Sequence, residues 1–176
     1  MAGLVFGGGV YTAYVFTQAP TKYEVVDSQV ALVVSERAFL ELYIPHQEAA
    51  TAAAQIVLEK GTRLRPLHDI AAKVAEEKRT ESEYLKEQYQ ALYGVSYAPT
   101  GVYRSTLRAL GELSTVELER AFLEDMIRHH EISIELAERG VSLSMKKEVA
   151  ELVEKSMAEA RVEILSLNEV RKLLPQ

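Results

Sequence analysis

A thirteen-residue segment occurs twice in this chain, and this repeat is the strongest constraint on the fold. The first copy, residues 36–48, reads ERAFLELYIPHQE, and the second, residues 119–131, reads ERAFLEDMIRHHE. Nine of the thirteen positions are identical, in the pattern ERAFLExxIxHxE. An internal repeat of this kind indicates that the chain is built from two related units. It also places a histidine at equivalent positions, His46 and His129, so the repeat bears on chemistry as well as on fold.

Each unit has the pattern of a long helical hairpin. Apolar residues at helical spacing, with Gly and Pro between the runs, predict helices over residues 28–60, 67–92, 115–139 and 143–174, and a short one over 105–110. The predicted divisions are a linker and the start of helix one at 22–35, a first hairpin at 36–94, a connection at 95–114 and a second hairpin at 115–176. Two amphipathic hairpins can bury their apolar faces against each other, so residues 22–176 are predicted to form one all-α, four-helix bundle with pseudo-twofold symmetry.

Composition excludes several classes of function. The chain has 176 residues, a net charge of −6 and no cysteine. No Lys/Arg cluster is present that could neutralise a phosphate backbone, so no nucleic-acid partner is expected. Without a thiol nucleophile, a Gly-rich phosphate loop or a serine elbow, the chain is not expected to be an enzyme. The oligomeric state stays open, and a homo-oligomer is one alternative.

The N-terminal segment differs in composition from the rest of the chain. Residues 1–21 carry no charge, and Lys22 is the first charged residue. One interpretation is a membrane anchor or an exported leader, because a spanning helix needs about 20 mostly apolar residues. In that case the bundle would be extracytoplasmic, in the periplasm or at the cell surface. The alternative is a disordered leader or a buried tail, since the segment is rich in glycine and lacks a basic start.

Helical periodicity gives the repeated histidines a direction. At 100° per residue, Phe39, Tyr43 and His46 share the apolar stripe of the first copy. Phe122, Met126 and His129 share the corresponding stripe of the second copy, so both histidines are predicted to point inward. The repeated glutamates at positions 41, 48, 124 and 131 lie on the opposite side and are predicted to face solvent. Each Glu-to-His interval is five residues, which does not match the Glu-x-x-His pairs of carboxylate di-iron bundles.

The second copy carries the set of side chains best suited to a metal. Asp125 and His129 are four residues apart on one helix face, Met126 lies beside them, and His130 lies at the edge of the stripe. Imidazole together with thioether favours copper, particularly the reduced ion. Packing of helix one against helix three would bring His46 to the same region. The sequence therefore predicts a metal site at His46, Asp125, Met126, His129 and His130, and the alternative is a buried polar cluster in which the histidines hydrogen-bond to protein groups.

The same residues resemble a known family. The stretch FLEDMIRHHE, residues 122–131, is similar to the FLxxMIPHHxxA signature of the domain-of-unknown-function-305 family, and Ile44-Pro45-His46 resembles a degenerate second copy of it. The resemblance implies a ferritin-like four-helix bundle that is often exported and sometimes binds copper through His and Met. Copy one has Tyr43 at the motif Met and Gln47 at the second His. The resemblance therefore implies a low-capacity metal site, or a structural and interaction bundle that has lost metal binding.

Overall fold

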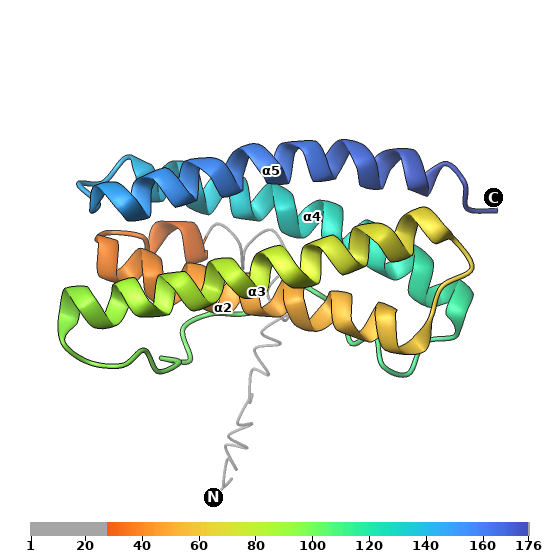
Figure 1. Ribbon diagram of the computed structural model, residues 1–176, viewed down its shortest axis with the longest axis horizontal. Coiled ribbons are helices and arrows are strands. Elements are labelled where there is room, and N and C mark those ends of the chain that lie inside the picture. The colour runs from red at the N-terminus through yellow and green to blue at the C-terminus, as the bar shows by residue number, and fades with distance from the viewer. Residues whose placement is uncertain (1–27, 176) are drawn as a thin grey trace, which may run out of the picture.

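A computed structural model describes residues 28–175, and four long helices make up most of this part of the chain. The helices are α2 (Glu36–Lys60), α3 (Arg65–Tyr93), α4 (Thr115–Val141) and α5 (Lys147–Arg171). Figure 1 shows α2 and α3 in one layer and α4 and α5 in the other, with all four axes running along the long dimension of the molecule. The principal helix contacts are within the hairpins, α2 with α3 and α4 with α5, and α2 also packs on α4. The predicted all-α four-helix bundle is confirmed.

Local capping chemistry explains where the helices begin and end. The hydroxyl of Ser35 accepts a hydrogen bond from the Ala38 N–H at the start of α2, and Ser114 with Glu117 forms the predicted capping box of α4. Gly61 and Gly94 end the first two helices with positive φ angles of 78° and 69°, which glycine adopts without steric cost.

Several predicted boundaries were wrong. Residues 28–31 form a separate helical turn rather than the start of α2, because the chain is non-helical at residues 33–35. Residues 105–110 were predicted to be helical and are irregular, and α5 is shorter than predicted at both ends. Pro45 lies within α2, which continues through it. The predicted anchor, residues 1–21, lies outside the described residues, and none of the helices between residues 28 and 175 has the length and apolar character needed to cross a bilayer.

The first glutamate of each repeat copy binds the loop of the opposite hairpin. The Glu36 carboxylate, on α2, accepts a 2.7 Å hydrogen bond from the Lys146 N–H in the α4–α5 loop. The Glu119 carboxylate, on α4, accepts a 2.6 Å hydrogen bond from the Arg63 N–H in the α2–α3 loop. We call this reciprocal pair of contacts the clasp. It joins the two hairpins at opposite ends of the bundle.

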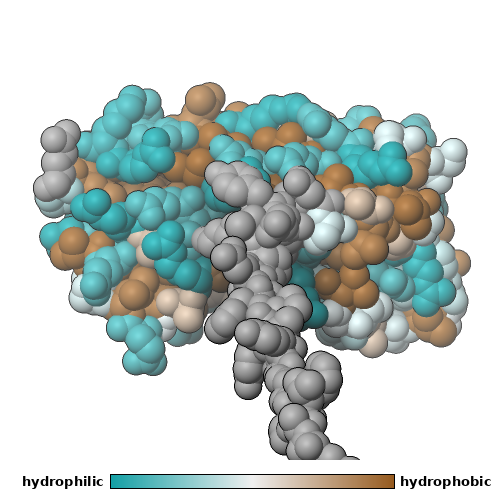
Figure 2. Space-filling view, turned by 180° about the vertical axis from the view of Figure 1, so that it is seen from behind, coloured by the Kyte–Doolittle hydropathy of each residue, from teal (hydrophilic) through white to brown (hydrophobic). Residues whose placement is uncertain are grey.

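The core divides into two apolar clusters, one toward each end of the bundle. Phe39, Tyr43 and Leu85 belong to one cluster, and Val57, Phe122 and Met126 belong to the other. On the face shown in Figure 2, the hydrophilic and hydrophobic residues of the described surface are interspersed. The glutamates at positions 41, 48, 124 and 131 lie at least partly in solvent as predicted, and Glu124 and Glu131 are exposed.

Gly140 illustrates how closely α4 approaches α2. A Cβ atom added at this position would lie 2.6 Å from two ring carbons of Phe39. Gly140→Ala is therefore expected to destabilise the fold by about 1–3 kcal/mol, because the overpacked ring must shift, although alanine is the better helix former. Urea unfolding measures the loss, and Gly111→Ala is the control because a Cβ there meets nothing within 4 Å. Equal stability of the two variants would contradict this packing argument.

Candidate functional site

The repeated histidines meet face to face where α2 packs on α4. The imidazole rings of His46 and His129 stack with centroids 3.7 Å apart and planes within 5° of parallel. His130 lies next to them, with its ring centroid 6.0 Å from that of His129. All three side chains are about 1% exposed. The structure thus brings together three of the five predicted site residues, and we call His46, His129 and His130 the histidine cluster.

The histidine cluster is held in the neutral form. Burial lowers the pKa of His46 and of His129 well below the usual value, and the adjacent histidine and the Lys78 ammonium each disfavour a proton there as well. Burial and then the Lys78 ammonium lower the pKa of His130 to about 3. Neutral imidazole is the form that binds metal ions. The cluster is therefore in a ligand-competent protonation state across the neutral and mildly acidic range.

Several nitrogens of the cluster lack a hydrogen-bond partner. They are Nε2 of His46, both ring nitrogens of His129 and Nε2 of His130. A buried polar atom without a partner costs free energy, so such atoms call for an explanation such as a bound ion. His130 Nε2 does lie 3.3 Å from the Glu163 carboxylate, which is within ion-pair distance but not aligned for a hydrogen bond. Lys73 lies 3.3 Å from the other Glu163 oxygen.

The other two predicted ligands have different surroundings. Asp125 is bound by Arg108 of the connection, whose backbone N–H, Nε and terminal nitrogen donate at 2.9, 2.8 and 2.7 Å. Met126 is fully buried in an apolar cluster with residues such as Phe122 and Leu123. Within residues 28–175, no group of three or more His, Asp or Glu side chains is arranged to hold a metal ion.

Fitting a metal ion to this cluster requires one movement. The lone pair of an imidazole nitrogen lies in the plane of its ring, so two rings stacked face to face direct their lone pairs side by side rather than toward a common point. One ring of the His46–His129 stack must turn before both nitrogens can bind one ion. Both ring nitrogens of His129 are unpartnered, so a turn of the His129 ring breaks no protein hydrogen bond. The donor set fits a soft ion that accepts imidazole ligands.

A second buried polar group, which was not predicted from the sequence, lies between α2, α3 and α5. The Lys78 ammonium, 1% exposed, lies 3.1 Å from one Glu81 oxygen and 3.4 Å from the Ser156 hydroxyl. Ser156 donates to Glu81 at 2.7 Å, and the Tyr43 hydroxyl donates to Ser156 at 3.1 Å. Gln47 also donates to Glu81. We call Tyr43, Gln47, Lys78, Glu81 and Ser156 the buried network.

Attraction between the charges maintains the ion pair of the buried network. Burial alone would lower the pKa of Lys78, but attraction to Glu81, Tyr43 and Glu163 together outweighs it and the pKa is raised. Burial raises the pKa of Glu81, and Lys78 and Ser156 counteract that rise. With an ammonium and a hydroxyl donating to its oxygens, Glu81 is best solvated as a carboxylate, so the network holds one positive and one negative charge.

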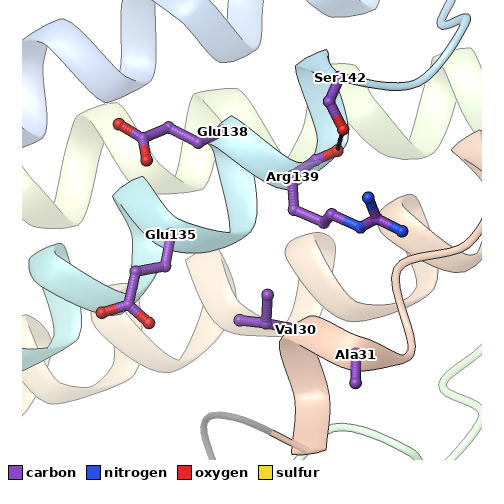
Figure 3. Close-up of a pocket in the computed structure, with 6 residues that line it drawn as sticks. All are labelled: Val30, Ala31, Glu135, Glu138, Arg139 and Ser142. Carbon is purple, nitrogen blue, oxygen red and sulfur yellow. Dashed lines mark hydrogen bonds between the residues drawn. The ribbon is translucent and has the colours of Figure 1, made fainter.

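One hollow of the surface lies away from both groups. It is a groove of about 650 Å³ between the turn at residues 28–31 and the C-terminal end of α4. Figure 3 shows Val30 and Ala31 on one side of the groove and Glu135, Glu138 and Arg139 on the other. Arg139 Nε donates to the Val33 carbonyl at 3.0 Å, so its guanidinium fastens the turn to α4. No histidine lines this groove.

Comparison with known proteins identifies the second half of the chain. The family model described as Domain of unknown function (DUF305) matches residues 95–171. This part of the chain is similar to the DUF305 family. The match contains α4, α5 and the connection that precedes them, and with them His129 and His130. A comparison with curated proteins finds no significant match.

Solved structures share the fold of nearly the whole described chain. CopM in the Cu(I)-bound form superposes with a TM-score of 0.70 at 20% identity, covering 78% of this chain and 96% of CopM. A DUF305 fragment from Deinococcus radiodurans gives 0.65 at 23% identity, covering 79% and 96%. A DUF305 protein from Streptomyces coelicolor, described as thought to be secreted, gives 0.64 at 19% identity, covering 77% and 90%. At these identities the likeness establishes the shared helical-bundle fold.

Proposed function

We propose that this DUF305 bundle is an exported protein that binds one Cu(I) ion at the histidine cluster. The observation that carries the proposal is the set of buried, neutral imidazoles whose ring nitrogens have no hydrogen-bond partner. His129 and His130 come from α4 and His46 from α2, so an ion bound there would join the two hairpins. Met126, next to His129 in the helical pattern, is the nearest thioether in sequence. Structures of CopM with Cu(I), Cu(II) and Ag support the choice of metal.

Electrostatics favour a monovalent ion over a divalent one. The Lys78 ammonium contributes to lowering the pKa of all three histidines, which shows that its positive charge acts on the cluster. The same repulsion acts twice as strongly on a doubly charged ion as on a singly charged one. Thioether and imidazole ligands also suit the reduced, softer ion. The proposed cargo is therefore Cu(I), with Ag(I) as its close analogue.

The proposal assigns the apolar segment at residues 1–21 the role of export signal or membrane anchor. The secreted character suggested for the Streptomyces coelicolor relative agrees with an extracytoplasmic location. The proposal includes neither catalysis nor nucleic-acid binding, because the buried cluster offers no nucleophile and the chain carries a net charge of −6. The cluster would store or hand over an ion rather than transform a substrate.

Titration with Cu(I) under anaerobic conditions, in competition with a chromophoric chelator, tests the proposal. The wild-type chain is expected to bind one ion, and His129→Ala is expected to lose that binding. His68→Ala is the matched control, because His68 is a half-exposed histidine on α3 outside the cluster. Equal Cu(I) binding by the wild type and by His129→Ala would refute the proposal.

One observation favours a second function, that of a structural or interaction bundle. The parallel stacking of His46 on His129 is a packing arrangement in its own right, and the Arg108–Asp125 pair already uses one predicted ligand. Thermal unfolding separates the two functions, since a ligand that binds only the native state raises the melting temperature. A structural bundle is expected to have the same melting temperature with and without Cu(I). A bundle that binds Cu(I) is expected to gain about 2.7 kcal/mol of unfolding free energy when the free ion is at about 100 times its dissociation constant.

A further inference from the structure

The connection between the hairpins lies across the place where the histidine cluster is buried. Residues 94–114 form neither helix nor strand, and Figure 1 shows them returning along the α2 side of the bundle to the start of α4. The Tyr103 ring meets His46 edge to face, with centroids 5.9 Å apart and planes at 87°. Leu107 packs against the apolar core and Leu110 is 2% exposed within it. The connection thus covers the cluster from the side where α2 meets α4.

Two of the side-chain contacts that fasten this segment to the bundle have a largely buried partner. Gln29 donates to the Arg104 carbonyl at 3.2 Å and accepts from the Arg104 N–H at 2.8 Å. Further along, Arg108 donates to both oxygens of Asp125, at 2.7 and 2.8 Å. Asp125 lies one helical turn before His129, so the second contact fastens the segment beside the cluster. The side chain of Asp125 is 4% exposed, which gives the pair a largely buried partner.

Any ion or reagent from solvent needs part of the structure to move, because the three histidines are about 1% exposed. Separating α2 from α4 would break the apolar core and the Phe39–Gly140 contact. Lifting residues 96–113 would break the two contacts above, the Arg108–Glu124 pair and the hydrogen bond from Lys60 to the Gly111 carbonyl. It would expose Tyr103, Leu107 and Leu110, and it would leave the hydrogen bonds within α2, α3 and α4 in place. Segments with little regular structure open at lower free energy than packed helices. The connection is therefore the part of this structure that opens most easily over the cluster.

We propose that residues 94–114 form a lid over the histidine cluster, with Tyr103 as the plug and the Arg108–Asp125 pair as the latch. Burial raises the pKa of Tyr103 to about 12, in agreement with a phenol shielded from water in the closed state. Opening admits the ion to the ring edges of His46 and His129, and closing excludes water and competing ligands. The proposal of a lid rests on the proposed function only for the identity of the ion, because the same opening would admit any reagent to the histidines.

The test uses the full-length, metal-free protein and diethyl pyrocarbonate, which acylates neutral imidazole, with mass spectrometry to assign the modified histidines. Exposed His68 is the internal reference. Arg108→Gln is expected to raise the rate of modification of His46 and His129 about tenfold relative to His68, since a lost pair of this kind corresponds to about 1.4 kcal/mol of opening free energy. Tyr103→Ala is expected to have a similar effect without disturbing the latch.

Arg63→Gln is the matched control. Arg63 also extends from a loop to a buried carboxylate on α4, donating to Glu119 at 2.6 Å, but at a site away from Tyr103. This variant should leave the modification rates near those of the wild type. Equal acceleration by Arg63→Gln and Arg108→Gln would show that the histidines react through global unfolding and would overturn the lid, as would no acceleration by Arg108→Gln and Tyr103→Ala. Because no metal is used, this result is independent of the Cu(I) titration.

Discussion

Lowering the pH from 7.5 to 5 is expected to reduce the free energy of unfolding by about 2–6 kcal/mol. The three buried histidines are neutral in the folded bundle, with the pKa of His130 lowered to about 3 and those of His46 and His129 also well below 6.5. In the unfolded chain they take up protons near pH 6.5, so the unfolded state binds more protons and stability falls as the pH falls. Each histidine contributes about 2 kcal/mol between pH 6.5 and 5.

Two buried carboxyl groups act in the opposite direction. Burial raises the pKa of Glu81 and of Glu163, so the folded state gains protons there before the unfolded state does, which adds stability as the pH falls toward 4.5. If each carboxyl group offsets one histidine, the equivalent of one histidine remains, about 2 kcal/mol, and without compensation three remain, about 6 kcal/mol. The sign is the same in both cases.

Urea unfolding followed by circular dichroism at several pH values measures this dependence. His129→Leu should make the loss of stability between pH 6.5 and 5 shallower by about one proton, because a titrating group has been removed. His68→Leu should keep the wild-type slope, because His68 is half exposed and outside the cluster. A wild-type stability that is constant, or that rises, between pH 6.5 and 5 would contradict the assignment of neutral buried histidines.

Glu81→Gln is expected to cost about 3–5 kcal/mol of stability, the largest effect of any single substitution considered. The change leaves the Lys78 ammonium buried without its counter-charge, and an unpaired buried charge is far more costly than a missing surface pair. Glu83→Gln is the control two residues away on α3. Glu83 pairs with Arg79 in solvent, with side chains 55% and 45% exposed, so its loss should cost less than about 1 kcal/mol.

Removing both charges should restore most of the stability. The double variant Lys78→Met/Glu81→Leu replaces the ion pair by apolar side chains of similar volume, an exchange that is often neutral or stabilising in a protein interior. Urea unfolding of the two single variants, the double variant and the control gives a complete comparison. If Glu81→Gln is no more destabilising than Glu83→Gln, Glu81 is not the counter-charge that stabilises the buried Lys78 ammonium.

The fold could be predicted from the sequence because its signals are local and repeated. Helical spacing of apolar residues, Gly61 and Gly94 at helix ends, and the Ser114–Glu117 capping box each depend on residues close in sequence. The inward direction of His46 and His129 followed from the same spacing, and the stacked rings confirm it. The predicted helix at residues 105–110 failed because tertiary contacts, Arg108 with Asp125 and Leu110 with the core, determine the path of that segment.

The buried network escaped prediction because charged residues were assigned to solvent by default. A signal was present: Lys78 and Glu81 fall on the apolar stripe of α3 between Val74 and Leu85, and Glu163 falls on that of α5 between Ala160 and Leu167. A charge at a core position requires a partner from another helix, and sequence spacing along one helix does not identify that partner. The Arg108–Asp125 ion pair could not be predicted for the same reason, since an irregular segment brings the two residues together.

The clasp has a consequence for how such a bundle can arise. In a twofold-symmetric dimer, each contact from the first subunit to the second is matched by the same contact from the second to the first. Glu36 on the Lys146 N–H and Glu119 on the Arg63 N–H have this form, with the two hairpins in place of the two subunits. In a lone hairpin, neither the glutamate at the start of the first helix nor the loop N–H would have its hydrogen-bond partner. The protein is thus the single-chain counterpart of a dimer of identical hairpins. The connection at residues 94–114 joins the two hairpins, and it makes the two halves different because it follows only the first of them.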